Sequence, residues 1–188
     1  MRIVAGTFRG RALVAPRGRA TRPTADATRQ ALFDVLSHAP WSPGLAGLRV
    51  IDLFAGAGTL GLEALSRGAG FCLFVETQAS ARAAIAANLE ALGLARAARV
   101  HRRDAAALGP RSAADGGPFA LAFLDPPYGQ GLGEAALQRL AHGRWLDDGA
   151  IAVLERGARD PAPRIAGFEA LDLRAWGAAS VAFLRHAP

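Results

Sequence analysis

The sequence predicts one α/β domain built on a doubly wound, mostly parallel sheet of seven strands. Three observations support this prediction. Short apolar runs alternate with stretches of helical periodicity, which is the pattern of a parallel sheet with helices on both faces. A glycine-rich turn at 56–61 directly follows the first apolar run. Two strand-like runs, 170–175 and 180–184, have no helix between them, so we expect an antiparallel pair to close the sheet.

The first residues are expected to form a basic arm, 1–23, and the rest of the chain, 24–188, the domain itself. Runs at 2–5 and 11–14 flank a glycine-containing turn and predict a small β-hairpin. Thr24 is the predicted N-cap of the first helix of the domain.

The elements of the domain follow in order. Apolar runs predict five strands before the closing pair, at 49–54, 71–76, 99–102, 119–124 and 150–154. Helical periodicity predicts helices at 24–37, 60–67, 79–92 and 133–142. Gly, Pro and Asp content predicts surface loops at 110–118 and 156–167.

Composition excludes several classes of protein. The 188 residues suit a single core, and no apolar run reaches the roughly 18 residues that a membrane-spanning helix needs. Cys72 is the only cysteine, which excludes an internal disulfide and a cysteine metal cage. The first ten residues lack the apolar block of a signal peptide. We therefore expect a cytoplasmic protein that uses no membrane and no metal.

All 22 basic residues are arginine, and they are unevenly placed. Residues 1–29 hold seven of them against one acid, Asp26, a net charge of +6, whereas residues 30–188 sum to zero. Arginine binds phosphate in a bidentate manner and stacks on bases, so the arm predicts contact with nucleic acid. The alternative is a solvated arm in a protein that simply uses arginine instead of lysine.

The turn at 56–61 matches G-x-G-x-x-G between a strand and a helix, and four acids surround it, namely Asp52, Glu63, Glu76 and Asp104. A dinucleotide pyrophosphate would be repelled by Asp52. S-adenosylmethionine carries a sulfonium, an ammonium and no phosphate, so it would be attracted. Glu76 follows Gly56 at the spacing at which a carboxylate meets ribose hydroxyls in doubly wound folds.

These residues also have structural interpretations. Gly56 and Gly58 could serve only a tight turn, and Asp52 could cap local backbone amides. Asp104 is as well suited to an N-cap as to accepting a hydrogen bond from the adenine amino group, and the backbone amide of Ala105 would share the contact with adenine.

The tetrad Asp125-Pro126-Pro127-Tyr128 follows the strand at 119–124, at the edge where open α/β sheets place ligands. Two prolines donate no backbone hydrogen bond and hold the chain extended, so the site accepts more hydrogen bonds than it donates. The exocyclic amine of a base fits it, with one hydrogen on the Asp125 carboxylate and one on the Pro126 carbonyl. Tyr128 would stack on the base. The alternative is an ordinary turn with Tyr128 as a core residue.

Together these motifs resemble known families. The segment 52–63 with the tetrad looks like a class I S-adenosylmethionine-dependent amino-methyltransferase. The segments 2–11, 21–24 and 29–33 resemble the bacterial 16S rRNA (guanine(966)-N(2))-methyltransferase family, often called RsmD. The resemblance covers essentially the whole chain. The arm motifs are specific to that family, whereas the glycine loop and the tetrad are shared with many methyltransferases.

The resemblance implies a Rossmann-like fold and methyl transfer from S-adenosylmethionine to a guanine N2 amine of 16S rRNA in the small ribosomal subunit, by a monomer. The cofactor-binding residues are then Asp52, Phe54, Ala55, Gly56, Gly58, Glu76, Asp104 and Ala105. The catalytic residues are Asp125, Pro126, Pro127 and Tyr128. The RNA-binding residues are Arg9, Arg11, Arg22 and Thr24.

Three positions depart from the family pattern: Ala27, Gln30 and Asp34 stand where arginine, glutamate and often asparagine are usual. They concern the arm and the first helix rather than the chemistry.

Three other functions are compatible with parts of the sequence. An adenine-N6 DNA methyltransferase uses the same tetrad, a protein glutamine methyltransferase usually has asparagine in place of Asp125, and a non-catalytic RNA-binding assembly factor would keep only the fold.

Overall fold

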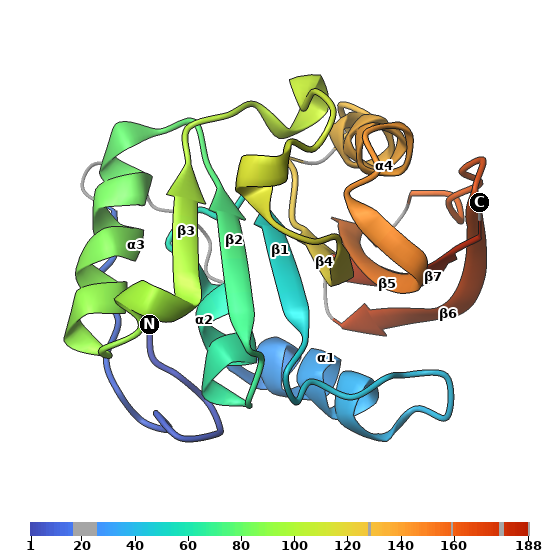
Figure 1. The fold of residues 1–188 in the computed structure, drawn as a ribbon. Helices are drawn as coiled ribbons and strands as arrows, with labels where there is room; N and C mark the ends of the chain where they lie inside the picture. The colour runs from blue at the N-terminus through green and yellow to red at the C-terminus, as the bar shows by residue number, and fades with distance from the viewer. Residues whose placement is uncertain (17–25, 128, 159, 177–178, 188) are drawn as a thin grey trace.

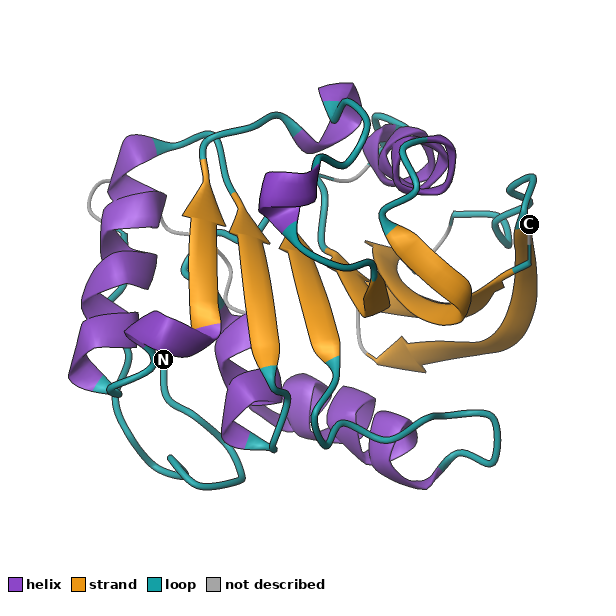
Figure 2. Cartoon of the chain, viewed as in Figure 1, coloured by secondary structure: helices purple, strands orange, loops and turns teal. Residues whose placement is uncertain are grey.

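Seven strands form one sheet in the order β3-β2-β1-β4-β5-β7-β6 (Figures 1 and 2). The computed structural model describes residues 1–16, 26–127, 129–158, 160–176 and 179–187. Strands β1 to β5 are parallel, β7 is antiparallel to β5, and β6 pairs antiparallel with β7. The doubly wound sheet with an antiparallel closing pair is therefore confirmed.

The strands and helices lie close to the predicted ranges. The strands are β1 (Arg49–Leu53), β2 (Phe71–Val75), β3 (Ala98–His101), β4 (Phe119–Leu124), β5 (Leu146–Gly157), β6 (Phe168–Trp176) and β7 (Ala179–His186). The helices are α1 (Asp26–His38), α2 (Thr59–Ser66), α3 (Ala79–Ala91) and α4 (Leu132–His142). Short 3-10 turns are η1 (Ala95–Ala97), η2 (Ala105–Ala107) and η3 (Ala113–Asp115).

The central strands are buried on both faces, because helices cover each side of the sheet. Val50, Phe74 and Phe123 belong to a core that includes side chains of α1, α2 and α3. Their neighbours along the strands, among them Leu53 and Leu124, belong to a second core with α4 and η2. In the part of the chain that the structure describes, no helix is both long and apolar enough to cross a membrane.

Strand β5 begins earlier than the predicted range of 150–154. Asp147, Asp148 and Gly149 are exposed and look like a turn in the sequence, yet they continue the strand. The pairing of β4 with β5 shifts register between Phe119 and Leu121, which accommodates the exposed segment as an irregularity. The predicted strand start was wrong because the apolar run begins only at residue 150, whereas the exposed polar residues before it also belong to the strand.

The N-terminal segment folds back on itself as predicted, but its pairing is short. One antiparallel bridge joins Arg2 and Ala12. Ile3 and Leu13 are buried in the core that contains α1, α2 and α3, so this segment packs into the domain. The residues around the expected boundary at 23, with Thr24, lie outside the described residues, and the division into arm and domain stays a prediction.

Gly6 fixes the contact between the N-terminal segment and α2. Its φ is +81°, and a Cβ there would overlap the Ser66 carbonyl oxygen, which accepts a 2.8 Å hydrogen bond from the Thr7 amide. We expect Gly6→Ala to lower the free energy of unfolding in urea by about 2–4 kcal/mol. Gly10 is a matched control, because it has the same φ and no atom within 4 Å of a Cβ. An equal loss in Gly10→Ala would show that backbone conformation, rather than this contact, determines the effect.

Candidate active site

Four carboxylates stand at the carboxyl ends of four neighbouring strands. Glu76 follows β2, Asp52 lies in β1, Asp125 follows β4, and Glu155 lies near the end of β5. Asp52, Glu76 and Glu155 are buried and Asp125 is half-buried. Three of the four were singled out in the sequence. Glu155 was not, because its place depends on the pairing of β5 with β4.

These carboxylates influence one another. Burial raises the pKa of Asp52 well above its ordinary value, and the charges of Asp125 and Glu76 raise it further. Burial, with the charge of Glu155, raises the pKa of Asp125 to about 7. The edge of the sheet is therefore an acidic site that favours a cation and disfavours a phosphate.

The glycine-rich turn leaves β1 in a strained conformation. Phe54 has φ +60°, although it is not glycine, and Gly56 and Gly58 have φ +54° and +78°. The Asp52 carboxylate accepts a 2.9 Å hydrogen bond from the Gly61 amide in the first turn of α2. The structural interpretation of Asp52 is thus observed, while its contact with a cofactor stays a prediction.

The glycines of the turn have different surroundings. A Cβ on Gly58 would lie 3.1 Å from Ile85 and 3.2 Å from Phe74, and one on Gly61 would collide with Phe74, so both glycines allow α2 to pack closely. Around Gly56, by contrast, only the Phe54 carbonyl oxygen lies as near as 4.0 Å. Gly56 is therefore the glycine of the turn past which a ligand can approach the backbone.

Glu76 links the glycine turn to the end of β2. One carboxylate oxygen accepts a hydrogen bond from the Gly56 amide at 2.9 Å, and the other accepts one from the Gln78 amide at 2.7 Å. The Ala55 amide donates to the Val75 carbonyl at 3.2 Å, which ties the same turn to β2. The predicted ribose acceptor is thus held beside the turn. The oxygen bonded to Gly56 keeps a lone pair for a ligand, whereas the other oxygen also accepts from the Thr77 hydroxyl at 3.4 Å.

Asp104 acts as an N-cap in the structure. Its side chain is exposed and accepts a 2.9 Å hydrogen bond from the Ala106 amide at the start of η2. Ala105 is buried in the core that contains α4. The N-cap interpretation is confirmed, and the contact of Asp104 and Ala105 with adenine stays a prediction.

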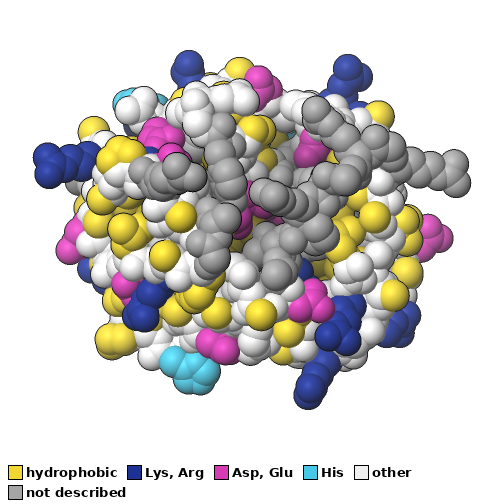
Figure 3. Space-filling view, turned by 180° about the vertical axis from the view of Figure 1, so that it is seen from behind, with side chains coloured by type: hydrophobic (Ala, Val, Ile, Leu, Met, Phe, Trp, Pro, Cys, Tyr) yellow, Lys and Arg dark blue, Asp and Glu magenta, His cyan; other side chains and the backbone are white. Residues whose placement is uncertain are grey.

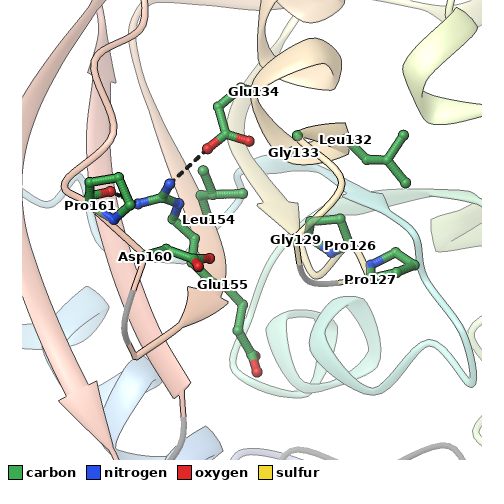
Figure 4. Close-up of a pocket in the computed structure, with 12 residues that line it drawn as sticks. Pro126, Pro127, Gly129, Leu132, Gly133, Glu134, Leu154, Glu155, Asp160 and Pro161 are labelled. Atoms are coloured by element: carbon green, nitrogen blue, oxygen red, sulfur yellow. Dashed lines mark hydrogen bonds and ion pairs between the residues drawn. The ribbon is translucent and has the colours of Figure 1, made fainter.

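The two prolines of the tetrad, Pro126 and Pro127, line a cavity of about 250 Å³ between the β4–α4 loop and the end of β5 (Figure 4). Pro126 is buried and Pro127 exposed, and Tyr128 lies outside the described residues. A Cβ on Gly133 would collide with Leu154 and lie 3.1 Å from Pro126, so α4 packs tightly behind the tetrad.

Glu63 lies away from the turn, contrary to the prediction that its charge acts there. It is fully buried and accepts hydrogen bonds from the amides of Val4 and Ala5 at 2.8 and 2.9 Å. It also pairs with Arg67 at 2.8 Å and with Arg29 at 3.6 Å. Residues two apart on a helix project about 200° apart, so Gly61 faces the sheet while Glu63 faces the N-terminal segment.

The basic charge of residues 1–29 is only partly available to a ligand. Arg29 is buried and pairs with Asp26, which also pairs with the exposed Arg2 at 2.9 Å. Arg9 is exposed, as is Arg11, which donates to the Ala91 carbonyl at the end of α3. Figure 3 shows arginines spread around the rim of one face. The predicted RNA contacts Arg22 and Thr24 lie outside the described residues.

Two of the unusual residues of the first helix interact with each other. The Gln30 amide donates to the Asp34 carboxylate at 2.6 Å, and Arg67 donates to the Gln30 oxygen at 2.9 Å. These departures from the family pattern therefore form a local network between α1 and α2.

Among the described residues, no group of three or more His, Cys, Asp or Glu is placed to hold a metal ion.

Comparisons with known proteins support the same family over the whole chain. The family model described as conserved hypothetical protein 95 matches residues 1–185. The "Putative rRNA methyltransferase YlbH" of Bacillus subtilis is 35% identical over 167 residues, which cover 89% of this chain and 88% of that protein. The "Ribosomal RNA small subunit methyltransferase D" of Escherichia coli K12 is 33% identical over 88% of this chain and 79% of its own length.

A solved structure agrees with the sequence matches. "Putative methyltransferase yhhF" from Escherichia coli superposes with a TM-score of 0.85 at 30% identity, covering 100% of this chain and 98% of that one. The parallel sheet with its antiparallel closing pair and the glycine turn of this chain are consistent with this likeness. The chain belongs to the conserved hypothetical protein 95 family, the RsmD family of class I methyltransferases.

Proposed function

We propose that this protein transfers a methyl group from S-adenosylmethionine to the exocyclic N2 amine of a guanine in small-subunit ribosomal RNA. One observation carries the proposal: an acidic row on strands β2, β1, β4 and β5 adjoins a proline tetrad that accepts hydrogen bonds. A cationic cofactor and an amine substrate are the ligands that such an edge favours.

The residues of the edge suit S-adenosylmethionine. When bound, this cofactor supplies an electrophilic methyl group on a cationic sulfonium. Gly56 offers open space next to the backbone, and the Glu76 carboxylate beside it has lone pairs for the ribose hydroxyls. The acidic residues next to the glycine turn, Asp52 and Glu76, suit a cationic cofactor better than the anionic pyrophosphate of a dinucleotide.

Asp125 and Pro126 would activate the amine. The guanine N2 lone pair is delocalised into the ring, so the nitrogen is a weak nucleophile until its hydrogens are held out of the ring plane. Hydrogen bonds to the Asp125 carboxylate and the Pro126 carbonyl orient the nitrogen, and the carboxylate stabilises the positive charge that develops on it. Orientation of two bound reactants can supply roughly 7–11 kcal/mol.

The RNA substrate is inferred from the relatives and the arm. The Escherichia coli relative is named a ribosomal RNA small subunit methyltransferase, and Arg9 and Arg11 are exposed on the N-terminal segment. We propose the guanine at position 966 of 16S rRNA as the target, presented by the small subunit. A guanine N2 inside a duplex would first have to be unstacked, which favours an exposed ribosomal loop.

Neutralising Arg9 and Arg11 together should weaken RNA binding by roughly 10-fold or more at low salt and should reduce the slope of log K against log[salt] by about 1–2. The expected cause is the loss of two phosphate contacts. Fluorescence anisotropy with a labelled rRNA fragment at several salt concentrations measures both quantities. A control variant without Arg96 and Arg174, two other exposed arginines, loses equal charge. Equal slopes for the two variants would contradict a role of the arm.

The function is tested by giving the protein labelled S-adenosylmethionine with three substrates: small subunits lacking the guanine-N2 methyl group, protein-stripped rRNA, and duplex DNA. The methylated nucleoside is then identified after digestion. Label in N2-methylguanosine of the subunits supports the proposal. Label in N6-methyladenine of the DNA would instead establish the adenine alternative, and absence of label in every sample would favour the non-catalytic assembly factor.

A further inference from the structure

We propose that Glu155 is a specificity-determining residue that accepts a hydrogen bond from the N1–H group of the target guanine. The inference rests on the proposed function and adds to it a reason why guanine, rather than another base bearing an exocyclic amine, is the substrate. Glu155 is not part of the glycine turn or the tetrad, and its role follows from the pairing of β4 with β5.

The sheet places Glu155 beside Asp125. Strands β4 and β5 are parallel, and Leu124 pairs with Leu154. Asp125 follows Leu124 directly after β4, and Glu155 follows Leu154 within β5. Adjacent parallel strands lie about 4.8 Å apart. Leu124 and Leu154 both point into the core that contains α4. Because side chains alternate along a strand, the Glu155 carboxylate leaves the sheet on the opposite face, and Asp125 comes directly after the last residue of the neighbouring strand.

The register of the sheet, rather than the cavity at Pro126 and Pro127, brings Glu155 to the tetrad. Glu155 borders that cavity, which is also lined by Leu154 and Gly133 on the α4 side, but its carboxylate leaves the sheet on the opposite face, and the residue is 7% exposed. Two further residues of this cavity, Glu134 and Arg156, form an ion pair 2.9 Å apart. Figure 4 shows the Glu155 carboxylate directed away from that ion pair. Arg156 pairs with Glu134, so the Glu155 carboxylate and this ion pair lie on different sides of the end of β5.

The two carboxylates are close enough to interact electrostatically. The charge of Glu155 contributes to the raised pKa of Asp125. The charge of Asp125 in turn helps to raise the pKa of Asp52, which lies on the neighbouring strand β1. The tetrad end of the site is therefore rich in hydrogen-bond acceptors that lie next to one another.

Guanine requires three hydrogen-bond acceptors on one edge. Its Watson–Crick edge presents the two hydrogens of the N2 amine and, next to them, the N1–H group. The Asp125 carboxylate and the Pro126 carbonyl account for the two amine hydrogens, so N1–H needs a third acceptor on the same side. Adenine has a lone pair at N1, which faces repulsion from a carboxylate. Glu155 thus favours guanine and disfavours adenine through a single contact.

A base analogue combined with a Glu155 variant tests this contact. 2-Aminopurine keeps the N2 amine but lacks O6 and has a lone pair instead of hydrogen at N1, so the change of base preference in the variant, rather than the wild-type preference alone, reports on N1–H. We would compare initial methylation rates of small subunits reconstituted with 16S rRNA that carries guanine or 2-aminopurine at the target. The assay is run near pH 8, where Asp125, with its pKa raised to about 7, is mostly ionised. We expect wild-type protein to prefer guanine by roughly 10- to 100-fold in kcat/KM.

Glu155→Gln should remove most of this preference, because an amide can either accept from N1–H or donate to an N1 lone pair. We expect its rate on guanine to fall by roughly 10-fold or more while its rate on 2-aminopurine holds or rises. Glu169→Gln is the matched control, since Glu169 is an exposed carboxylate on β6 that pairs with Arg185. It should leave both rates and their ratio unchanged.

Two results would overturn the role of Glu155, and a third would overturn the proposed function instead. Equal wild-type rates on guanine and 2-aminopurine would overturn it without any variant, even if Glu155→Gln fails to fold. Parallel losses of Glu155→Gln on both bases would assign Glu155 a structural role only. Absence of wild-type methylation of guanine would instead overturn the proposed function.

Discussion

Replacing Asp125 by alanine is expected to lower kcat for methyl transfer by about 10³-fold and to change the affinity for S-adenosylmethionine by less than about threefold. In the proposed mechanism, the variant loses the carboxylate that orients the amine and stabilises its developing positive charge. The glycine turn, Glu76 and Asp52 keep their mutual hydrogen bonds, because none of them depends on Asp125. Single-turnover methylation of small subunits and calorimetric titration with the cofactor measure the two effects.

Asp125→Asn separates charge from hydrogen bonding. Its amide oxygen still accepts one amine hydrogen, so its kcat should lie between those of wild type and Asp125→Ala, roughly 10- to 100-fold below wild type. Asp148→Asn is a control, because Asp148 is exposed near the opposite end of β5. A loss of cofactor affinity as large as the loss of rate would show that Asp125 belongs to the cofactor site.

The same variants should reveal a stability cost at the active site. The folded-state pKa of Asp125 is raised to about 7 by burial and by Glu155, whereas the unfolded carboxyl titrates near 4. Between these values the folded state holds a proton that the unfolded state has lost, so the free energy of unfolding falls as pH rises from about 4 to about 7. In Asp125→Asn, which has no carboxyl group at this position, the free energy of unfolding does not decrease for this reason.

Asp125→Asn should therefore match wild type in stability near pH 4 and exceed it by about 2–4 kcal/mol above pH 7. Urea unfolding of both proteins across this range gives the difference at each pH. The difference between the two proteins isolates the effect of Asp125, including its effect on the pKa of Asp52. A difference that stays constant from pH 4 to pH 8 would contradict the raised pKa.

Sequence patterns predicted the sheet well because burial on both faces imposes continuous apolar runs. The runs at 119–124 and 71–76 became β4 and β2 within one residue, and the polar residues directly after them fell at the carboxyl edge. Asp125 and Glu76 could therefore be placed in one site from their positions alone. The prediction failed at the start of β5, where exposed Asp147 and Asp148 do not contact the core that generates the pattern.

The missed parts of the site depend on contacts between distant segments. Glu155 lies in an ordinary strand ending, and only its pairing beside Asp125 gives it significance. Glu63 lies two residues from Gly61, but the turn of the helix directs it to the opposite side. For Asp104 the sequence left two roles open, and the local backbone of η2 determines the one that is observed.

Glu63→Ala is expected to lower the free energy of unfolding by about 3–5 kcal/mol. Glu63 is fully buried, and its loss removes the acceptor of the Val4 and Ala5 amides together with the buried counter-charge of Arg29 and Arg67. Urea unfolding measures the loss, and hydrogen exchange at the Val4 and Ala5 amides should accelerate. Glu90→Gln, on the exposed side of α3, should change stability by less than about 0.5 kcal/mol.

The position of Glu63 also links stability to substrate binding. Helix α2 begins at the glycine turn, where Asp52 holds the Gly61 amide, and two residues later Glu63 holds the N-terminal segment that carries Arg9 and Arg11. A single helix thus sets the distance between the cofactor turn and the arm. Below its unfolding temperature, Glu63→Ala should keep the affinity for S-adenosylmethionine and lose affinity for RNA. Equal loss of both affinities would show instead that the whole helix has moved.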